Sequence, residues 1–192
     1  MVAPDRTDPP APTSGAPRHL VSRSPAATQA LGRALGRAAR PGWILAIEGD
    51  LGAGKTCLVR GLAEGLEIEG QVSSPTYTLV ASHQGRLELL HFDAWMEGRE
   101  RALLADGGAE ELGGEAVCAI EWADRVADVL PTPRLRLRLA HLSEHERSIE
   151  LSVVGEDREM ERTLREALPL GPELLEAPPA GASGGTERRG AP

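Results

Sequence analysis

Residues 49–56 read GDLGAGKT, a stretch whose residue types and spacing could bind phosphate. They match the pattern G-x-x-x-x-G-K-[ST] at every fixed position. The glycines would let the backbone turn tightly, so that several N–H groups point at phosphate oxygens beside the positive end of the next helix. We expect Lys55 to reach the outer phosphates and Thr56 to offer its hydroxyl to Mg²⁺. The expected nucleotide-binding loop comprises Gly49, Asp50, Leu51, Gly52, Ala53, Gly54, Lys55 and Thr56.

Lys55 is the only lysine among the 21 lysines and arginines of the chain. A planar guanidinium cannot substitute for a compact ammonium inside a loop that wraps phosphate, which explains a lysine at this position. A chance match to the pattern is the alternative interpretation. The apolar run 43–47 before the loop and the helical spacing of Leu58, Leu62 and Leu66 after it supply the strand and helix that the motif requires.

The rest of a nucleotide site must come from elsewhere in the chain. The sequence contains no asparagine, so it lacks the Asn-Lys-x-Asp motif of guanine-reading proteins, and ATP is favoured. Mg²⁺ needs oxygen ligands and an attacking water must be oriented. Asp93 follows the strand-like run LELLHF and Glu121 follows VCAI, so both are candidates for these roles. The alternative for either residue is a solvated carboxylate at a strand end.

The pattern of the remaining chain predicts an α/β fold of the P-loop NTPase type, with a single mixed sheet flanked by helices. One helix is expected from Ser24-Pro25 to Pro41, one after the phosphate loop, an irregular one over 99–113, a short one after Glu121 and a last one over 157–168. Strands are expected at 43–47, 76–82, 86–92, 116–121, 134–140 and 147–154, with antiparallel pairing of the second with the third and of the last two.

A length of 192 residues fits one globular domain with tails. We expect residues 1–19 to be a disordered Pro-rich tail, 20–168 a P-loop ATPase domain, and 169–192 a second disordered tail rich in Pro, Gly and Ala. The net charge of −8 disfavours direct binding to nucleic acid. Two cysteines give no disulfide framework, and no apolar stretch has the length of a signal peptide or membrane span. These features favour the cytoplasm.

Four segments together resemble a known family. They are Gly49 to Thr56, Ser74-Pro75-Thr76-Tyr77-Thr78, His91-Phe92-Asp93 and Glu121-Trp122. They occur in the same order and at similar spacing as in the TsaE (YjeE) family, bacterial ATPases required for making threonylcarbamoyladenosine in tRNA. The resemblance extends from about Ser24 to Val153.

The resemblance implies a role for each matching residue. Thr56 and Glu121 would hold Mg²⁺, Asp93 would orient water or metal at the γ-phosphate, and Thr76 would lie in a switch-like loop that senses this phosphate. Thr28 on the first helix and Arg147 in the last hairpin are weaker candidates for nucleotide contacts. Trp122 either borders the nucleotide or is simply packed in the core. The implied cofactors are ATP and Mg²⁺, hydrolysis in isolation would be slow, and the implied partners are the proteins of the threonylcarbamoyl-transfer complex, with tRNA involved only indirectly.

The chain departs from the family pattern after Asp93. Family members usually continue with Leu-Tyr-Arg, whereas this chain has Ala94-Trp95-Met96, so Arg99 or Arg101 would have to supply the missing cation. Two other functions stay open. A small-molecule P-loop kinase would need an arginine-bearing lid, and 99–113 is mostly acidic and glycine-rich. A non-catalytic nucleotide-sensing module would need only the phosphate loop.

Overall fold

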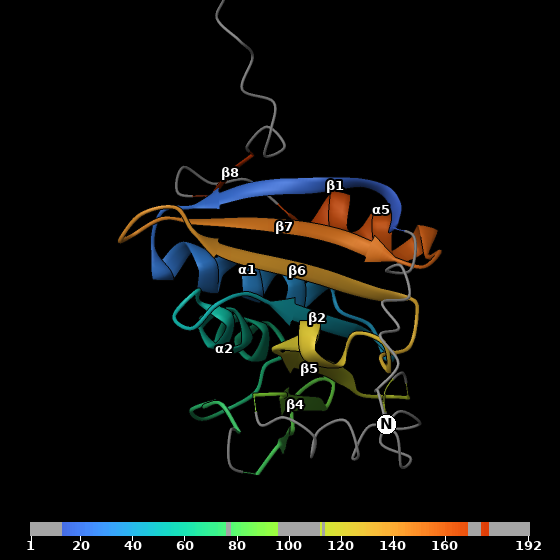
Figure 1. Ribbon diagram of the computed structural model, residues 1–192. Coiled ribbons are helices and arrows are strands. Elements are labelled where there is room, and N and C mark those ends of the chain that lie inside the picture. The colour runs from blue at the N-terminus through green and yellow to red at the C-terminus, as the bar shows by residue number, and fades with distance from the viewer. Residues whose placement is uncertain (1–12, 76–77, 96–111, 113, 169–173, 177–192) are drawn as a thin grey trace, which may run out of the picture.

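The computed structural model describes residues 13–75, 78–95, 112, 114–168 and 174–176, and these form a single mixed sheet flanked by helices (Figure 1). The eight strands lie in the order β3-β4-β5-β2-β6-β7-β1-β8. They are β1 (Thr13–Ser22), β2 (Ile44–Glu48), β3 (Val80–His83), β4 (Leu89–Asp93), β5 (Val117–Glu121), β6 (Arg134–His141), β7 (Arg147–Val154) and β8 (Leu174–Glu176). The helices are α1 (Pro25–Ala38), α2 (Lys55–Gly65), α5 (Arg158–Ala167) and the 3-10 helix η2 (Ala123–Val126). The predicted fold class is confirmed.

The central strands β4, β5, β2 and β6 are parallel, and this brings the chemistry-bearing residues to one edge of the sheet. Asp93 and Glu121 are direct cross-strand partners at the carboxyl ends of β4 and β5. The glycine-rich loop leaves the carboxyl end of β2, the next strand along. In open α/β sheets, ligands bind at this edge, because loops from several strands meet there.

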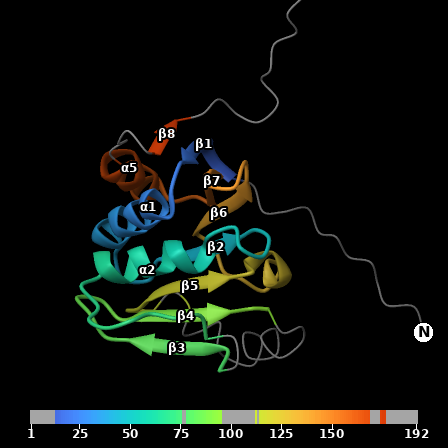
Figure 2. The same ribbon diagram turned by 90° about the vertical axis from the view of Figure 1, so that its left-hand side faces the viewer.

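The sheet separates two hydrophobic clusters, and the alternation of side chains along β2 assigns each residue to one of them. Leu45 and Ile47 pack with α1, α2 and α5, which Figure 2 shows along one side of the sheet. Ile44 and Ala46 pack on the opposite face with residues of β5 and η2. A strand buried on both faces reads as a continuous apolar run, which is why 43–47 was recognisable from the sequence.

Helices α1 and α2 pack unusually closely because glycines face each other across the contact. Ser24 caps α1, since its Oγ accepts a hydrogen bond from Ala27 N at 3.1 Å, and Pro25 begins the helix. A Cβ added to Gly61 on α2 would lie 2.0 Å from Gln29 O on α1. The close contact fixes the start of α2, and with it Lys55, against the N-terminal half of α1.

Residues 1–19 were expected to form a disordered tail, and this expectation is wrong for residues 13–19, because they belong to strand β1 of the sheet. β1 pairs antiparallel with β7, and Leu20 is 1% exposed in the main core. The prolines and small polar residues before Leu20 hid this strand from pattern analysis. The pairing has a register shift between Ser14 and Arg18, and an irregularity of this kind is where a strand tolerates proline such as Pro17.

The expected C-terminal tail needs a similar correction, because Leu174–Glu176 forms the edge strand β8 on β1. A strand of three residues is too short to show a period. Residues 1–12, 169–173 and 177–192 lie outside the described residues, so the rest of both expected tails stays a prediction.

The remaining element predictions hold with shifted boundaries. β3 with β4 and β6 with β7 are antiparallel pairs, as expected. The helix expected over 99–113 falls almost entirely outside the described residues, and the short helix after Glu121 is a single 3-10 turn. None of the described helices has the length and apolar character to cross a membrane.

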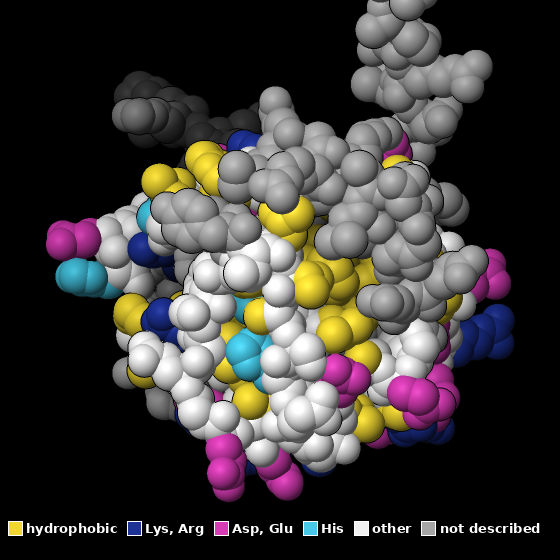
Figure 3. Space-filling model, turned by 90° about the horizontal axis from the view of Figure 1, so that it is seen from below, with side chains coloured by type: hydrophobic (Ala, Val, Ile, Leu, Met, Phe, Trp, Pro, Cys, Tyr) yellow, Lys and Arg dark blue, Asp and Glu magenta, His cyan; other side chains and the backbone are white. Residues whose placement is uncertain are grey.

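Figure 3 shows the face of the molecule that is seen from below in the view of Figure 1. Hydrophobic and histidine side chains lie in the middle of this face.

Candidate functional site

A cavity of about 370 Å³ opens at the carboxyl ends of the parallel strands, beside the glycine-rich loop. It brings together four residues that the sequence analysis selected from separate segments, namely Lys55, Thr56, Asp93 and Glu121. Its lining is completed by Leu51, Gly52, Gly54, Cys57, Ser74, Trp95 and Trp122.

The glycine-rich loop has the backbone geometry that its sequence predicts. Gly49, Gly52 and Gly54 have φ values of 138°, 74° and 103°, where residues with a Cβ are strained. A Cβ on Gly49 would also lie 2.2 Å from Leu139 O, so neighbouring β6 leaves no room for a side chain. Ala53 is fully buried, whereas Asp50 and Leu51 are exposed at the tip of the loop.

Lys55 begins α2 and turns back toward its own loop. Its Nζ donates to Gly49 O at 2.7 Å and to Asp50 O at 2.9 Å, and it lies 3.4 Å from the centre of the Trp122 ring. Burial lowers the pKa of Lys55 below its usual value, and the nearby carboxylates oppose this shift, with Glu121 first among them. The ammonium therefore lies in a partly desolvated site surrounded by acidic groups.

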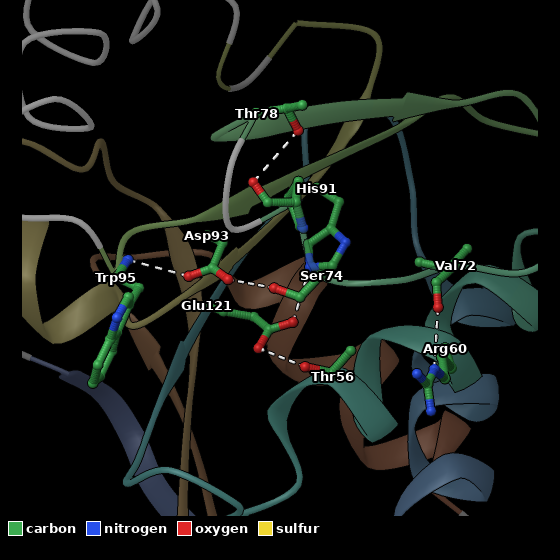
Figure 4. A network of polar contacts seen from close by, with 10 residues as sticks. Thr56, Arg60, Val72, Ser74, Thr78, His91, Asp93, Trp95 and Glu121 are labelled. Atoms are coloured by element: carbon green, nitrogen blue, oxygen red, sulfur yellow. Dashed lines mark hydrogen bonds and ion pairs between the residues drawn. The ribbon is translucent and has the colours of Figure 1, made fainter.

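Thr56, Glu121 and His91 form a chain of hydrogen-bonded side chains (Figure 4). Thr56 Oγ1 donates to Glu121 Oε2 at 2.9 Å, and Glu121 Oε1 lies 2.9 Å from His91 Nε2. Glu121 is 2% exposed and His91 is fully buried. The two predicted metal ligands are thus in direct contact, and His91, which the sequence analysis used only as part of a motif, contacts one of them.

Asp93 is tied to the segment that precedes Thr76. Ser74 Oγ donates to Asp93 Oδ2, and the backbone N–H of Trp95 donates to Oδ1 at 3.1 Å (Figure 4). Ser74 therefore connects the predicted switch-like loop to the carboxylate that was expected to orient water. Thr76 itself lies outside the described residues, so its role stays a prediction.

Two tryptophans form one wall of the cavity. The ring centres of Trp95 and Trp122 are 4.5 Å apart, and the Arg125 guanidinium lies 4.5 Å from the first ring and 5.1 Å from the second. Trp122 has a φ of 58°, which is strained for a bulky residue and is typical of functional sites. The Trp122 ring lines the cavity and contacts Lys55, and it also packs against the second hydrophobic cluster, so its contact with a nucleotide stays a prediction.

Family members usually have an arginine directly after the aromatic residue that Trp95 matches. In this chain a different arginine, Arg125, contacts Trp95. Met96, Arg99 and Arg101 lie outside the described residues. Arg125 Nη1 donates to Trp95 O, so this arginine holds the end of β4 from a different segment. The sequence analysis did not select it, because no pattern around 125 indicates a contact with residue 95.

A second cavity of about 230 Å³ adjoins the first, between the start of α1 and the loop that joins β6 to β7. Thr28 and Arg147, the two weaker candidates, both line it. Arg147 Nη2 donates to Gly52 O at 3.4 Å. Thr28 is 2% exposed and its Oγ1 lies 2.8 Å from Ser22 Oγ, so its hydroxyl is engaged within the protein. Gly52, Gly54 and Cys57 line both cavities.

The comparison with protein families settles the relationship of the chain. Residues 22–149 match the family model described as "Threonylcarbamoyl adenosine biosynthesis protein TsaE". The chain belongs to the TsaE family. The TsaE match begins at the last residue of β1 and ends within β7, so it includes both cavities' walls and leaves α5 and β8 outside.

Individual TsaE proteins are similar over most of their own length. The chain is 40% identical over 129 residues to the tRNA threonylcarbamoyladenosine biosynthesis protein TsaE of Treponema pallidum, covering 67% of this chain and 96% of the relative. It is 39% identical over 139 residues to the Bacillus subtilis protein of that name, covering 71% and 86%. The crystal structure of Bacillus subtilis YdiB superposes with a TM-score of 0.67 at 32% identity, covering 79% of this chain and 96% of YdiB.

Proposed function

We propose that the protein binds ATP and hydrolyses it in a Mg²⁺-dependent reaction, as an accessory ATPase of threonylcarbamoyladenosine biosynthesis. The TsaE family takes its name from this pathway, and the chain belongs to that family. The observation that carries the ATPase proposal is the convergence of Lys55, Thr56, Asp93 and Glu121 on one cavity beside a complete phosphate-binding loop. A lysine, a hydroxyl and two carboxylates are the groups that phosphoryl transfer requires.

The two adjoining cavities fit the parts of ATP. The larger one, beside Lys55, would take the phosphates, and the smaller one, beside Thr28 and Arg147, would take the nucleoside. Their volumes of about 370 and 230 Å³ together lie within the range of small-molecule sites. ATP is preferred to GTP because the chain has no asparagine for a guanine-reading motif.

The donor set at Thr56 and Glu121 fits Mg²⁺. Mg²⁺ prefers oxygen ligands, uses one or two protein groups and fills its remaining positions with water and phosphate oxygens. Thr56 Oγ1 and Glu121 Oε2 are 2.9 Å apart and line the cavity. Bound Mg²⁺ would neutralise charge on the phosphates.

Lys55 and Asp93 would bind the phosphates and orient the attacking water. Lys55 would exchange the carbonyls of Gly49 and Asp50 for phosphate oxygens. Asp93 would orient the attacking water. Its two oxygens accept one hydrogen bond each, from Ser74 and from the Trp95 backbone, and these bonds fix the carboxylate while leaving acceptor positions for a water.

The proposed purpose of the ATPase cycle is to act on the proteins of the threonylcarbamoyl-transfer complex. A chain with a net charge of −8 is poorly suited to bind tRNA directly, so tRNA would be reached through these partners. A small-molecule kinase is the first alternative and a non-catalytic nucleotide sensor the second. The site of action would be the cytoplasm, where tRNA is modified.

Two variants test the ATPase proposal. Lys55→Ala should abolish ATP binding, because Lys55 is the only cationic side chain among the described residues that line the larger cavity. Glu121→Ala should keep some ATP binding but lose Mg²⁺-dependent turnover, because it removes a metal ligand and leaves Lys55 in place. ATP binding would be measured by calorimetry and turnover by phosphate release, with and without candidate acceptors.

Equal turnover by the Glu121→Ala variant and the parent would remove Glu121 from the site. Phosphate release that depends on a small-molecule acceptor would favour the kinase, and binding without any release would favour the sensor.

A further inference from the structure

His91 is a fully buried histidine in the middle of the sheet, outside the cavity itself. It lies on β4, and its cross-strand neighbours are Ala81 on β3 and Ala119 on β5. The two alanines leave room beside the backbone for an imidazole. His91 precedes Asp93 by two residues, and Asp93 pairs with Glu121, so His91 is the diagonal neighbour of Glu121 on the same face of the sheet.

The two nitrogens of His91 have different surroundings. Nε2 lies 2.9 Å from Glu121 Oε1, whereas no hydrogen-bond partner for Nδ1 is found among the residues that the structure describes. A carboxylate only accepts hydrogen bonds, so the hydrogen belongs on Nε2. A hydrogen on Nδ1 would be buried with no acceptor among the described residues, which is unfavourable. The geometry therefore gives His91 a single hydrogen bond, donated to Glu121.

This hydrogen bond acts on the orientation of the carboxylate. Thr56 holds Oε2 of Glu121 and His91 holds Oε1, so the two contacts together fix the rotation of the carboxylate about its last bond. If a metal replaces the direct contact between Thr56 and Glu121, the contact with His91 is the one that remains. We propose that His91 is a positioning residue that holds Glu121 Oε1 and so aims Oε2 at the metal of the proposed ATPase site.

The inference rests on the proposed function, and it makes a prediction about metal affinity that a purely structural histidine would not satisfy. Partners that orient a ligand from behind typically change metal affinity by about 10–100-fold when they are removed. A histidine that only fills the core would affect stability and leave the affinity for metal unchanged.

The experiment compares two amide substitutions that differ in reach. The amide nitrogen of glutamine lies about as far from the backbone as Nε2 of histidine, whereas that of asparagine lies only as far as Nδ1. Mn²⁺ would be titrated by electron paramagnetic resonance into the full chain saturated with a non-hydrolysable ATP analogue. We expect His91→Asn to weaken Mn²⁺ binding by about tenfold or more and His91→Gln to recover most of the loss. Binding of the analogue without metal should be the same for all three proteins.

Each other outcome has a definite meaning. Parent-like Mn²⁺ affinity in both variants would overturn the role of His91, and so would equal weakening in both, because reach would then not matter. If the parent chain did not bind Mn²⁺ with the analogue, the metal site of the proposed function would fall together with the inference. Normal Mn²⁺ binding by the parent therefore shows that the metal site exists, so a failure in the variants would concern the role of His91 alone.

A measurement on the unsubstituted protein covers the possibility that the variants fail to fold. Long-range proton–nitrogen NMR spectra of ¹⁵N-histidine-labelled protein report which ring nitrogen carries the hydrogen. We expect His91 to have its hydrogen on Nε2, and the Nε2 resonance to shift when the analogue and Mg²⁺ are added together. A hydrogen on Nδ1, or a resonance that does not respond to the metal, would overturn the proposal.

Discussion

Lys55 has three contacts that a bound phosphate would replace, namely the carbonyls of Gly49 and Asp50 and the ring of Trp122. The first two belong to the phosphate loop itself. The third comes from the residue after Glu121, held in a left-handed backbone conformation. An ammonium over an indole face gains about 0.5–1 kcal/mol at an exposed site. Trp122 therefore contributes to holding Lys55 Nζ beside the carbonyls of its own loop.

Trp122→Leu should consequently strengthen ATP binding by about two- to fivefold. This factor of about two to five is the change in dissociation constant that corresponds to the free energy of the lost cation–π contact. Dissociation constants from calorimetry would measure the effect. Trp95→Leu is the matched control, because Trp95 lines the same cavity and, among the described residues, the cation over its ring is Arg125 and not Lys55. Weaker ATP binding by the Trp122 variant would mean that the indole contacts the nucleotide instead.

The candidate site could be predicted from sequence where local patterns carry the information. Lys55 and Thr56 follow from the loop motif, and Asp93 and Glu121 follow from strand ends that meet at one edge of a parallel sheet. His91, Ser74 and Arg125 could not be given roles in this way. Their partners are 30, 19 and 30 residues away in the chain, and only the folded sheet brings them together.

At the scale of elements, the sequence analysis did not predict β1 and β8. Both strands are stabilised mainly by contacts with neighbouring elements of the fold. The central strands β2 and β5 are apolar on both faces and can be recognised alone. Thr13–Ser22 has few apolar residues and an interrupted register, and it is held by β7 and by Arg18, which donates to Leu164 O at 3.3 Å and pairs with Glu176 at 2.5 Å. β1 therefore depends on tertiary contacts that leave no periodic signal in the sequence.

Two truncations test the importance of β1. Deleting residues 1–12 keeps every described contact and should leave the unfolding temperature nearly unchanged. Deleting residues 1–18 removes Arg18 and the pairing of Thr13 and Ser14 with β7, and each lost hydrogen bond costs about 0.5–1.5 kcal/mol. We expect the longer deletion to lower the unfolding temperature by about 5 °C or more. Equal melting of the two truncated proteins would show that the first half of β1 contributes nothing.

The edge strand β3 carries a histidine that should make stability depend on pH. His83 Nε2 is buried, and no partner for it is found in the described part of the chain. Burial lowers the pKa of His83 from 6.5. Between the lowered value and 6.5 the unfolded chain binds more protons than the folded one, so stability falls as the pH drops through this range and is unaffected above it.

Unfolding temperatures of the parent and of His83→Gln at pH 7.5 and pH 5.5 would measure this effect. The parent should lose more stability on acidification than the variant, in which the titrating group is gone. His145→Gln is the control, because His145 is exposed in the loop between β6 and β7. If the variant lost as much stability as the parent, His83 would not be the group responsible.

For the whole molecule, the exposed apolar side chains of the described part gather near the proposed nucleotide site. The chain is acidic, with a net charge of −8. The large hydrophobic side chains that are exposed in the described part are Leu51, Trp95 and Leu142, at 78%, 41% and 54%. Leu51 and Trp95 line the larger cavity, and Leu142 follows His141, whose Nε2 lies 3.3 Å from Leu51 O. The rim of the proposed nucleotide site is therefore a candidate contact surface for proteins.

The last prediction concerns what the ATPase cycle accomplishes. If ATP acts through Ser74 and Asp93 on the loop that follows, the protein should reset the threonylcarbamoyl-transfer complex between rounds and should not modify tRNA itself. Adding it to the purified complex with ATP should raise the number of modified tRNAs made per complex, and Lys55→Ala, unable to bind ATP, should not. Arg162→Ala, at an exposed position of α5 outside both cavities, is the control and should stay active. Modified nucleoside would be counted by mass spectrometry after a fixed time. Transfer to tRNA by this protein alone, or equal cycling of the complex without it, would contradict the assignment.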